Sequence, residues 1–232
     1  MIMNEKELKS IIKNKLFYEL KMEASKCNYF LNIYTPELDH MGFNYILDDL
    51  ENMAKVKFMI IDKQQDDRSF LVKKSLLRPD HALLKQKEID FLNFAPGLGG
   101  CIILAETDSM RDFSVNYYYT DYLLIKAFSL QLVWSENKIT QNFLNDFLYD
   151  LKRGAPKEEI SVNKRLFIQA QDPEALLCLT GLDTKSYDRW RAKLINLIKK
   201  ESSLANEQAQ QSIFEITETL MKLSQDIKVF QE

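Results

Sequence analysis

The sequence predicts an α/β fold, a mixed sheet flanked by helices over residues 1–152, followed by an all-α region over residues 153–232. Two observations carry this prediction. Before about residue 130, short apolar or β-branched runs alternate with stretches in which apolar residues recur at helical spacing. From Ser135 onward the spacing is helical, and the polar stretch Arg153–Ser161, which contains Gly154 and Pro156, marks the expected domain boundary.

Composition places the chain among ordinary globular proteins. Of its 232 residues, 46% are hydrophobic and 28% are charged, and the net charge is −3. A disordered chain would be less apolar, and a general polyanion binder would be basic. No apolar run approaches the ~20 residues that span a bilayer, and Met1–Ser10 carries no signal-peptide core. The three cysteines, Cys27, Cys101 and Cys178, are widely spaced, so we expect buried thiols and a cytoplasmic protein.

In the N-terminal half, the expected elements follow one another at short intervals. An apolar face at 3.6-residue spacing predicts the first helix, and its residues are Leu8, Ile11, Ile12, Leu16 and Leu20. The elements expected in order are a helix from a cap at Asn4 to about Lys26, strands over 28–34, 42–48 and 56–61, a strand or the entry to a helix over 69–77, a helix between Pro79 and Phe94, strands over 101–105 and 112–119, and a helix capped by Thr120.

In the C-terminal half, a helix capped by Thr140 is expected to end near Gly154. A helix-turn-helix-like segment follows over residues 173–200, and a terminal amphipathic helix over residues 204–230. These two elements make up the expected all-α region.

The order helix, strand, strand, strand, helix, strand over about residues 5–128 resembles the restriction-endonuclease-like superfamily, called PD-(D/E)XK after its site. Three segments carry the resemblance: PELDHMGFNYIL (Pro36–Leu47), KFMIIDK (Lys57–Lys63) and GGCIILAE (Gly99–Glu106). In that family, an acidic residue on one strand and an E/D/Q-x-K trio on the next converge on Mg²⁺, and the lysine orients or activates the attacking water.

This sequence departs from the family pattern at the working positions. Asn44 stands where the strand aspartate is expected, and Met59 and Ile61 stand where the second acid and the lysine are expected. Two acids remain in the entry segment, Glu37 and Asp39, and they are the candidate catalytic residues if the chain is an active Mg²⁺-dependent nuclease. Otherwise the resemblance implies a nuclease-like fold with no catalytic site, metal or cofactor. The alternative to the resemblance is that Gly42–Ile61 is a β-hairpin in an unrelated α/β sheet.

A second pattern, Glu174–Leu194, resembles bacterial helix-turn-helix proteins in which a glycine in the turn, here Gly181, is followed by a recognition helix ending in Arg-Trp. Such a helix enters the major groove of DNA. The alternative is a plain helical hairpin anchored by Tyr187 and Trp190. Under the DNA-binding hypothesis, the residues that reach bases or phosphates are Lys185, Arg189, Arg191 and Lys193.

The terminal helix carries a heptad pattern typical of a coiled-coil seam. Its apolar positions are Ile213, Ile216, Leu220, Leu223, Ile227 and Phe230. This seam either binds a protein partner or a second copy, or packs against the preceding helix of the same chain. Phe214, Met221 and Val229 lie off the seam and indicate a further contact.

These patterns lead to three functional hypotheses. The first is a non-catalytic protein-interaction module, an adaptor or accessory subunit of a bacterial multiprotein assembly; the bacterial origin rests on a sequence rich in Asn, Lys and Ile. The second is a DNA-binding regulator that uses residues 174–194. The third is a metal-dependent DNA endonuclease with a rearranged site.

Overall fold

A computed structural model describes residues 5–37, 42–63, 68–79, 99–107, 114–135, 139–182, 190–199 and 207–228. Its helices and strands are α1 (Glu5–Lys26), β1 (Asn32–Tyr34), β2 (Tyr45–Asp48), β3 (Met53–Asp62), β4 (Ser69–Lys73), α2 (Lys74–Leu77), β5 (Cys101–Thr107), β6 (Val115–Asp121), α5 (Tyr122–Ser129), β7 (Trp134–Ser135), α6 (Gln141–Lys152), β8 (Glu159–Asn163), the 3₁₀ turn η1 (Lys164–Leu166), β9 (Ile168–Gln169), α7 (Pro173–Thr180), α8 (Trp190–Lys199), α9 (Glu207–Leu223) and β10 (Ile227–Lys228).

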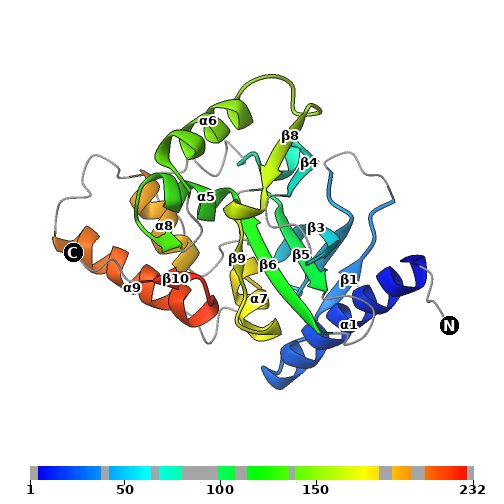
Figure 1. The fold of residues 1–232 in the computed structure, drawn as a ribbon. Coiled ribbons are helices and arrows are strands. Elements are labelled where there is room, and N and C mark those ends of the chain that lie inside the picture. Colours follow the sequence, from blue (N-terminus) through cyan, green and yellow to red (C-terminus); the bar gives the residue numbers. More distant parts are fainter. Residues whose placement is uncertain are drawn as a thin grey trace.

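A mixed sheet of six strands, in the order β1-β2-β3-β5-β6-β9, forms the centre of the fold (Figure 1). β3 and β5 pair in parallel, and every other neighbouring pair in this sheet is antiparallel. Parallel neighbours need a crossover connection. Residues 80–98, where the sequence predicts a helix between Pro79 and Phe94, belong to this connection and lie outside the described residues. The expected mixed sheet flanked by helices is thus present.

Helix α1 covers one face of the sheet with side chains that recur every fourth residue. Ile12, Leu16, Leu20 and Ala24 are all buried. The adjacent Phe17 ring meets Tyr45 of β2 edge-on, with ring centroids 4.8 Å apart. Ile11, which the sequence analysis placed on the buried face, is 41% exposed instead. The reason is that a spacing of four residues drifts around a helix with 3.6 residues per turn, so the buried stripe excludes position 11.

The opposite face of the sheet is covered by a second layer that includes chain from beyond residue 152. β8 pairs with β4, and the turn η1 follows β8. Thr120 of β6 donates to the Leu166 carbonyl over 2.7 Å. After residue 152 the described helices are α7, α8 and α9, but β8, β9 and β10 correct the expectation that this region is all-α. The division into two domains at this point stays a prediction.

α8 and α9 gather with α5 and α6 at the end of the molecule away from α1, whereas α7 packs beside α1 (Figure 1). α7 begins at Asp172, whose carboxylate accepts the Ala175 N–H over 2.7 Å. It ends at Gly181, which has a φ of +84°, a left-handed conformation that glycine adopts without strain. α8 and α9 then pack against each other, and β10 pairs with β7.

Two helix caps test the sequence analysis at single residues. Thr140 caps α6 as predicted, because its side-chain oxygen accepts the Phe143 N–H over 3.3 Å. The prediction that Thr120 caps the preceding helix is wrong by one residue. Asp121 caps α5, and its carboxylate accepts the Leu124 N–H over 2.8 Å. Thr120 still belongs to β6.

Candidate functional site

The β2–β3 hairpin holds the three positions at which the family resemblance expects a metal site. Tyr45 pairs with Val56, so Asn44, just before β2, lies beside Lys57. Alternate residues of a strand share a face. Met59 and Ile61 therefore lie on one face of the sheet, opposite the face that α1 covers, and Asn44 lies in the segment that leads into β2.

The Asn44 side chain helps to hold this hairpin together through two hydrogen bonds. Its Nδ2 donates to the Phe58 carbonyl over 2.9 Å, and its Oδ1 accepts the Phe58 N–H over 2.7 Å. The side-chain amide thus matches both the donor and the acceptor of one backbone residue. Ile61 is buried and Met59 is half-buried. In place of carboxylates and a lysine, these positions supply an amide bound to the backbone and two apolar side chains.

The acidic residues near the hairpin are placed differently from metal ligands. Glu37 is exposed, and Asp39 lies outside the described residues. Asp48 and Asp49 shape the turn between β2 and β3: Asp48 accepts the Leu50 N–H over 2.8 Å, and Asp49 accepts the Asn52 N–H over 2.6 Å. Among the described residues, no group of three or more His, Cys, Asp or Glu side chains is arranged to hold a metal ion.

One acidic residue on β5 has a buried basic partner. Glu106 pairs with Lys164 of η1 and accepts the Tyr118 hydroxyl over 2.9 Å. The Lys164 ammonium also lies 4.7 Å from the centre of the Tyr118 ring. Because this carboxylate is already compensated by a cation and a hydroxyl, the cluster links the sheet to the layer that covers it.

The segment expected to bind DNA contributes one of its basic residues to the core. Arg191 is 4% exposed. Its guanidinium donates to Asp121 Oδ2 over 2.5 Å and to the Tyr119 hydroxyl and the Leu179 carbonyl, each over 2.8 Å. A guanidinium held in this way does not reach DNA, which corrects the role expected for Arg191.

Electrostatics agree with a structural role for this arginine. Burial by itself lowers the pKa of Arg191, but the Asp121 carboxylate and the Tyr119 hydroxyl outweigh burial and raise it. Within the described part of the chain, the Arg191 Nε has no hydrogen-bond partner. Sequence reasoning missed the pairing because Arg191 and Asp121 lie far apart in the chain and no local pattern joins them.

The other three basic residues of this segment say less about whether it can bind DNA. Lys193 forms an ion pair with Glu215 of α9 over 2.9 Å, so its ammonium is directed to the neighbouring helix. Lys185 and Arg189 lie outside the described residues. DNA binding by the segment stays a prediction that rests on these two residues.

The heptad positions of the terminal helix face the interior of the same chain. Ile216, Leu220 and Leu223 of α9 are fully buried, Ile227 is buried in β10, and Ile213 is partly buried. Phe230 lies outside the described residues. These residues therefore do not offer a seam to a partner. The alternative, packing against the preceding helix, is the arrangement observed. Off the seam, Phe214 is 56% exposed.

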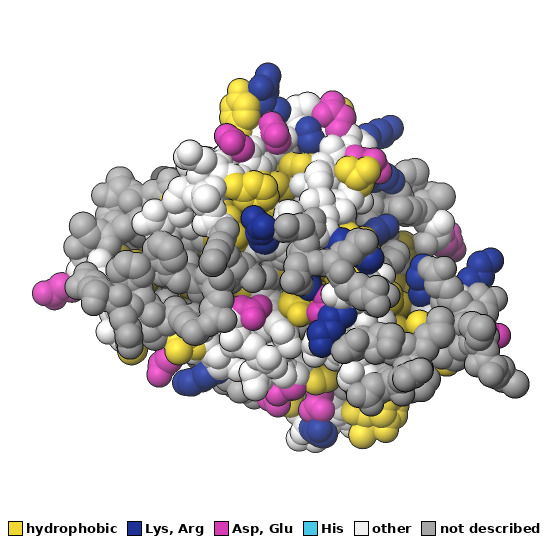
Figure 2. Space-filling view, in the orientation of Figure 1, with side chains coloured by type: hydrophobic (Ala, Val, Ile, Leu, Met, Phe, Trp, Pro, Cys, Tyr) yellow, Lys and Arg dark blue, Asp and Glu magenta, His cyan; other side chains and the backbone are white. Residues whose placement is uncertain are grey.

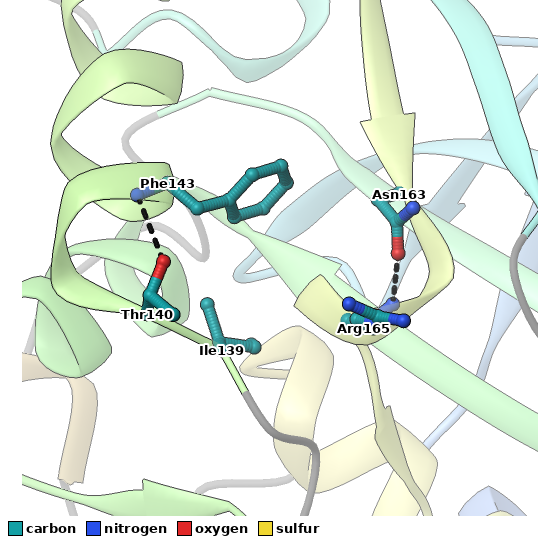
Figure 3. A pocket seen from close by; sticks show the side chains of 5 residues that line it. All are labelled: Ile139, Thr140, Phe143, Asn163 and Arg165. Atoms are coloured by element: carbon teal, nitrogen blue, oxygen red, sulfur yellow. Dashed lines mark hydrogen bonds between the residues drawn. The ribbon is translucent and has the colours of Figure 1, made fainter.

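A pocket that the sequence analysis did not identify lies between the start of α6 and the turn after β8 (Figure 3). Ile139, Thr140 and Phe143 line one side, and Asn163 and Arg165 line the other. The pocket has a volume of about 150 Å³. In the space-filling view, apolar side chains lie beside a basic one in the hollow below α6 (Figure 2). No sequence signal joins residues 139–143 to 163–165.

The three cysteines are consistent with the expected thiols. Cys101 and Cys178 are buried, Cys27 is half-buried, and none of them is in a disulfide. Burial raises the pKa of the Cys101 thiol, and the neighbouring Asp121 carboxylate raises it further. Such a thiol is a poor nucleophile.

Across the described part of the chain, no helix has both the length and the apolar character to span a bilayer. Comparisons of this chain with models of known families, with curated proteins and with solved structures find no match.

Proposed function

We propose that this chain is a non-catalytic protein-interaction module, an adaptor or accessory subunit of a bacterial multiprotein assembly, on a nuclease-like frame that lacks the metal site. Support for the frame comes from the chain order α1, β1, β2, β3 and β5, with β4 and α2 inserted before β5, and from the shared face of Met59 and Ile61. Support for the loss of catalysis comes from what these residues do, because the Asn44 amide is bound to the backbone of Phe58.

The observation that carries the interaction role is that α1 has two apolar faces. One face is buried against the sheet. On the other, Ile11, Tyr18 and Met22 are 41%, 66% and 42% exposed. Their spacing of seven and four residues places them on one stripe of the helix. α1 lies at the periphery of the fold (Figure 1), so this stripe is open to a partner.

An outward apolar stripe does not stabilise the chain's own fold. Fully burying one side chain of this size is worth about 1.5–3 kcal/mol, and the fold leaves part of that free energy unused on this face of α1. The chain that follows α1 exposes further aromatic side chains, Phe30 and Tyr34. Tyr34 belongs to β1, one of the two edge strands of the sheet, and shares with Ile46 the face opposite α1. Exposed apolar side chains and sheet edges are both features of protein-binding surfaces.

A capture experiment with matched variants tests this proposal. The full chain carrying Ile11→Ser, Tyr18→Ser and Met22→Ser is compared with wild type in a lysate of the organism that encodes it. The control changes three exposed polar residues of the same helix, Ser10→Ala, Asn14→Ala and Lys21→Ala. We expect a protein that wild type and the control retain and that the stripe variant loses.

Two outcomes would count against the interaction role. One is that the stripe variant retains the same proteins as wild type. The other is that wild type is monomeric in sedimentation and retains no protein specifically. Surface substitutions usually change the free energy of unfolding by no more than about 0.5 kcal/mol, so unfolding curves of all three proteins identify any loss that comes from misfolding.

A further inference from the structure

The pocket between α6 and the turn after β8 has one apolar side and one cationic side. Ile139 and Phe143 provide the apolar surface, and the Phe143 ring is 38% exposed. Across from them, Arg165 contributes a cationic side chain to the lining (Figure 3). The two sides come from segments that follow α5 and β8, so the fold and not a local motif creates the pocket.

Three side chains that line the pocket carry hydrogen-bond donors: Thr140, Asn163 and Arg165. The Thr140 oxygen already accepts the Phe143 N–H, which leaves its hydroxyl proton to donate. Asn163 Oδ1 already accepts the Arg165 N–H over 2.9 Å, and its amide donates to Ser69 over 3.3 Å. Arg165 has five side-chain N–H donors, so it can bind an anion alongside other contacts.

The charge of the lining sets the class of ligand. None of the described residues that line the pocket is acidic, and one is an arginine. An arginine beside a hydroxyl donor matches a carboxylate, which accepts from both. The apolar surface next to these donors matches a hydrophobic body attached to that carboxylate.

The volume of the pocket fits an apolar group of roughly one ring attached to the carboxylate. This volume of about 150 Å³ is close to that of an engineered apolar cavity of about 150 Å³, in another protein, that binds benzene. A larger ligand would have to leave part of its apolar surface in water.

We propose that this pocket binds a carboxylate carried on a small apolar group, with Arg165 and Thr140 as donors and Phe143 as the apolar contact. A free small carboxylic acid and the carboxyl-terminal residue of a protein present the same chemistry. The proposal does not rest on the interaction role of α1, since the pocket lies on α6 and the two surfaces share no residue.

Titration of the ¹⁵N-labelled full chain with benzoate tests the proposal, with benzamide as the uncharged analogue of the same shape. We expect benzoate to shift resonances around the pocket and benzamide to bind at least about tenfold more weakly, since a hydrogen bond to a charged group contributes about 1.5–3 kcal/mol. Equal binding of the two, or no binding of benzoate, would overturn the proposal.

Two variants of pocket residues and two control variants test whether benzoate binds in the pocket. Arg165→Gln and Phe143→Ala are each expected to weaken benzoate binding about tenfold. Arg153→Gln and Tyr149→Ala remove an exposed arginine and an exposed aromatic ring at the other end of α6, and they should bind benzoate as wild type does. Benzoate binding that is unchanged in Arg165→Gln would contradict the assignment.

A further titration with a peptide distinguishes a free small carboxylic acid from the carboxyl-terminal residue of a protein. A short peptide ending in phenylalanine is titrated with a free and with an amidated carboxyl terminus. Tighter binding of the free peptide than of benzoate supports a protein terminus, and weaker binding supports a free small acid. If the amidated peptide binds as well as the free one, recognition does not involve the carboxylate, and the proposal fails.

Discussion

Arg191 on α8 and Asp121 at the end of β6 form a buried ion pair, in which guanidinium Nη2 donates to carboxylate Oδ2 over 2.5 Å. The same carboxylate accepts the Leu124 N–H at the start of α5 and the Tyr119 hydroxyl. One aspartate therefore joins the central sheet, the helix that follows it and the C-terminal helices. We infer that this pair fixes the position of the helical region against the sheet.

The first prediction is that Asp121→Asn lowers the free energy of unfolding by about 3–5 kcal/mol, because it leaves the buried Arg191 charge without its partner. Asparagine still caps a helix through its oxygen, so the loss comes from the other side of the group, where an amide donor replaces the carboxylate oxygen that accepts from Arg191 and Tyr119. Urea unfolding at pH 7 measures the effect.

Two further variants show whether the stability loss of Asp121→Asn comes from the buried ion pair. Lys222→Met breaks the exposed pair with Glu218, and we expect a change below about 0.5 kcal/mol. Combining Asp121→Asn with Arg191→Met removes both partners and should recover part of the lost stability, because apolar replacements of buried pairs are often neutral. An Asp121→Asn chain as stable as Lys222→Met would contradict the role of the pair.

Local patterns were enough to predict much of the fold. The helix over 5–26 and the strand within 53–62 follow from apolar periodicity, and the α6 cap at Thr140 follows from residue type and position. In each case the determining residues lie within a few positions of one another. The same holds for Gly181, which ends α7.

Features set by distant contacts could not be predicted in this way. The heptad spacing continues from Leu223 to Ile227, yet the helix ends at Leu223. Ser224 bridges Ala170, and Asp226 accepts the Gln169 N–H over 2.6 Å. Pairing with a segment more than fifty residues away outweighs the helical pattern there. The pocket is the same kind of case, because the Phe143 and Arg165 sides meet only in the folded chain.

A second prediction concerns Asn44→Asp, which restores an acid at the strand position of the nuclease frame. The new carboxylate cannot donate to the Phe58 carbonyl, so two acceptors face each other where Nδ2 now donates. We expect a loss of about 1–3 kcal/mol in the free energy of unfolding, measured by urea titration. No Mg²⁺-dependent cleavage of duplex DNA should appear, because Met59 and Ile61 are not metal ligands.

The matched variant for this change is Asn145→Asp, at an exposed asparagine on α6. It introduces the same charge away from the hairpin and should cost less than Asn44→Asp. Cleavage by the Asn44→Asp chain, abolished by EDTA, would show that the frame retains a metal site that the described residues do not account for.

A third prediction separates the two roles considered for the terminal helix. Leu220→Ala should lower the free energy of unfolding by about 2–5 kcal/mol, because it opens a cavity in the core. Phe214→Ala, on the exposed side of the same helix, should change it by about 0.5 kcal/mol or less. Because the heptad residues pack within one chain, the melting temperature of wild type should not depend on protein concentration. A melting temperature that rises with concentration would indicate a seam between chains.

The last prediction concerns alkaline pH and the contact between α1 and the sheet. The Tyr117 hydroxyl donates to Glu19 of α1 over 2.6 Å. Burial raises the pKa of this phenol, and the Glu19 carboxylate raises it further. A tyrosine in the unfolded chain ionises near pH 10, so the folded chain keeps this proton to higher pH than the unfolded chain does. The stability that this group contributes is therefore complete below about pH 10 and is lost as the pH rises above it.

Tyr117→Phe removes that titration. At pH 7 we expect it to lower the free energy of unfolding by about 1.5–3 kcal/mol, since it deletes a hydrogen bond to a charged group. Between about pH 9 and 11 its stability should then fall less steeply than that of wild type, because one titrating group is gone. Tyr18→Phe, at a tyrosine that is 66% exposed, should reproduce the wild-type slope. A Tyr117→Phe chain that loses stability as steeply as wild type would mean that the contact between Tyr117 and Glu19 does not set the alkaline limit.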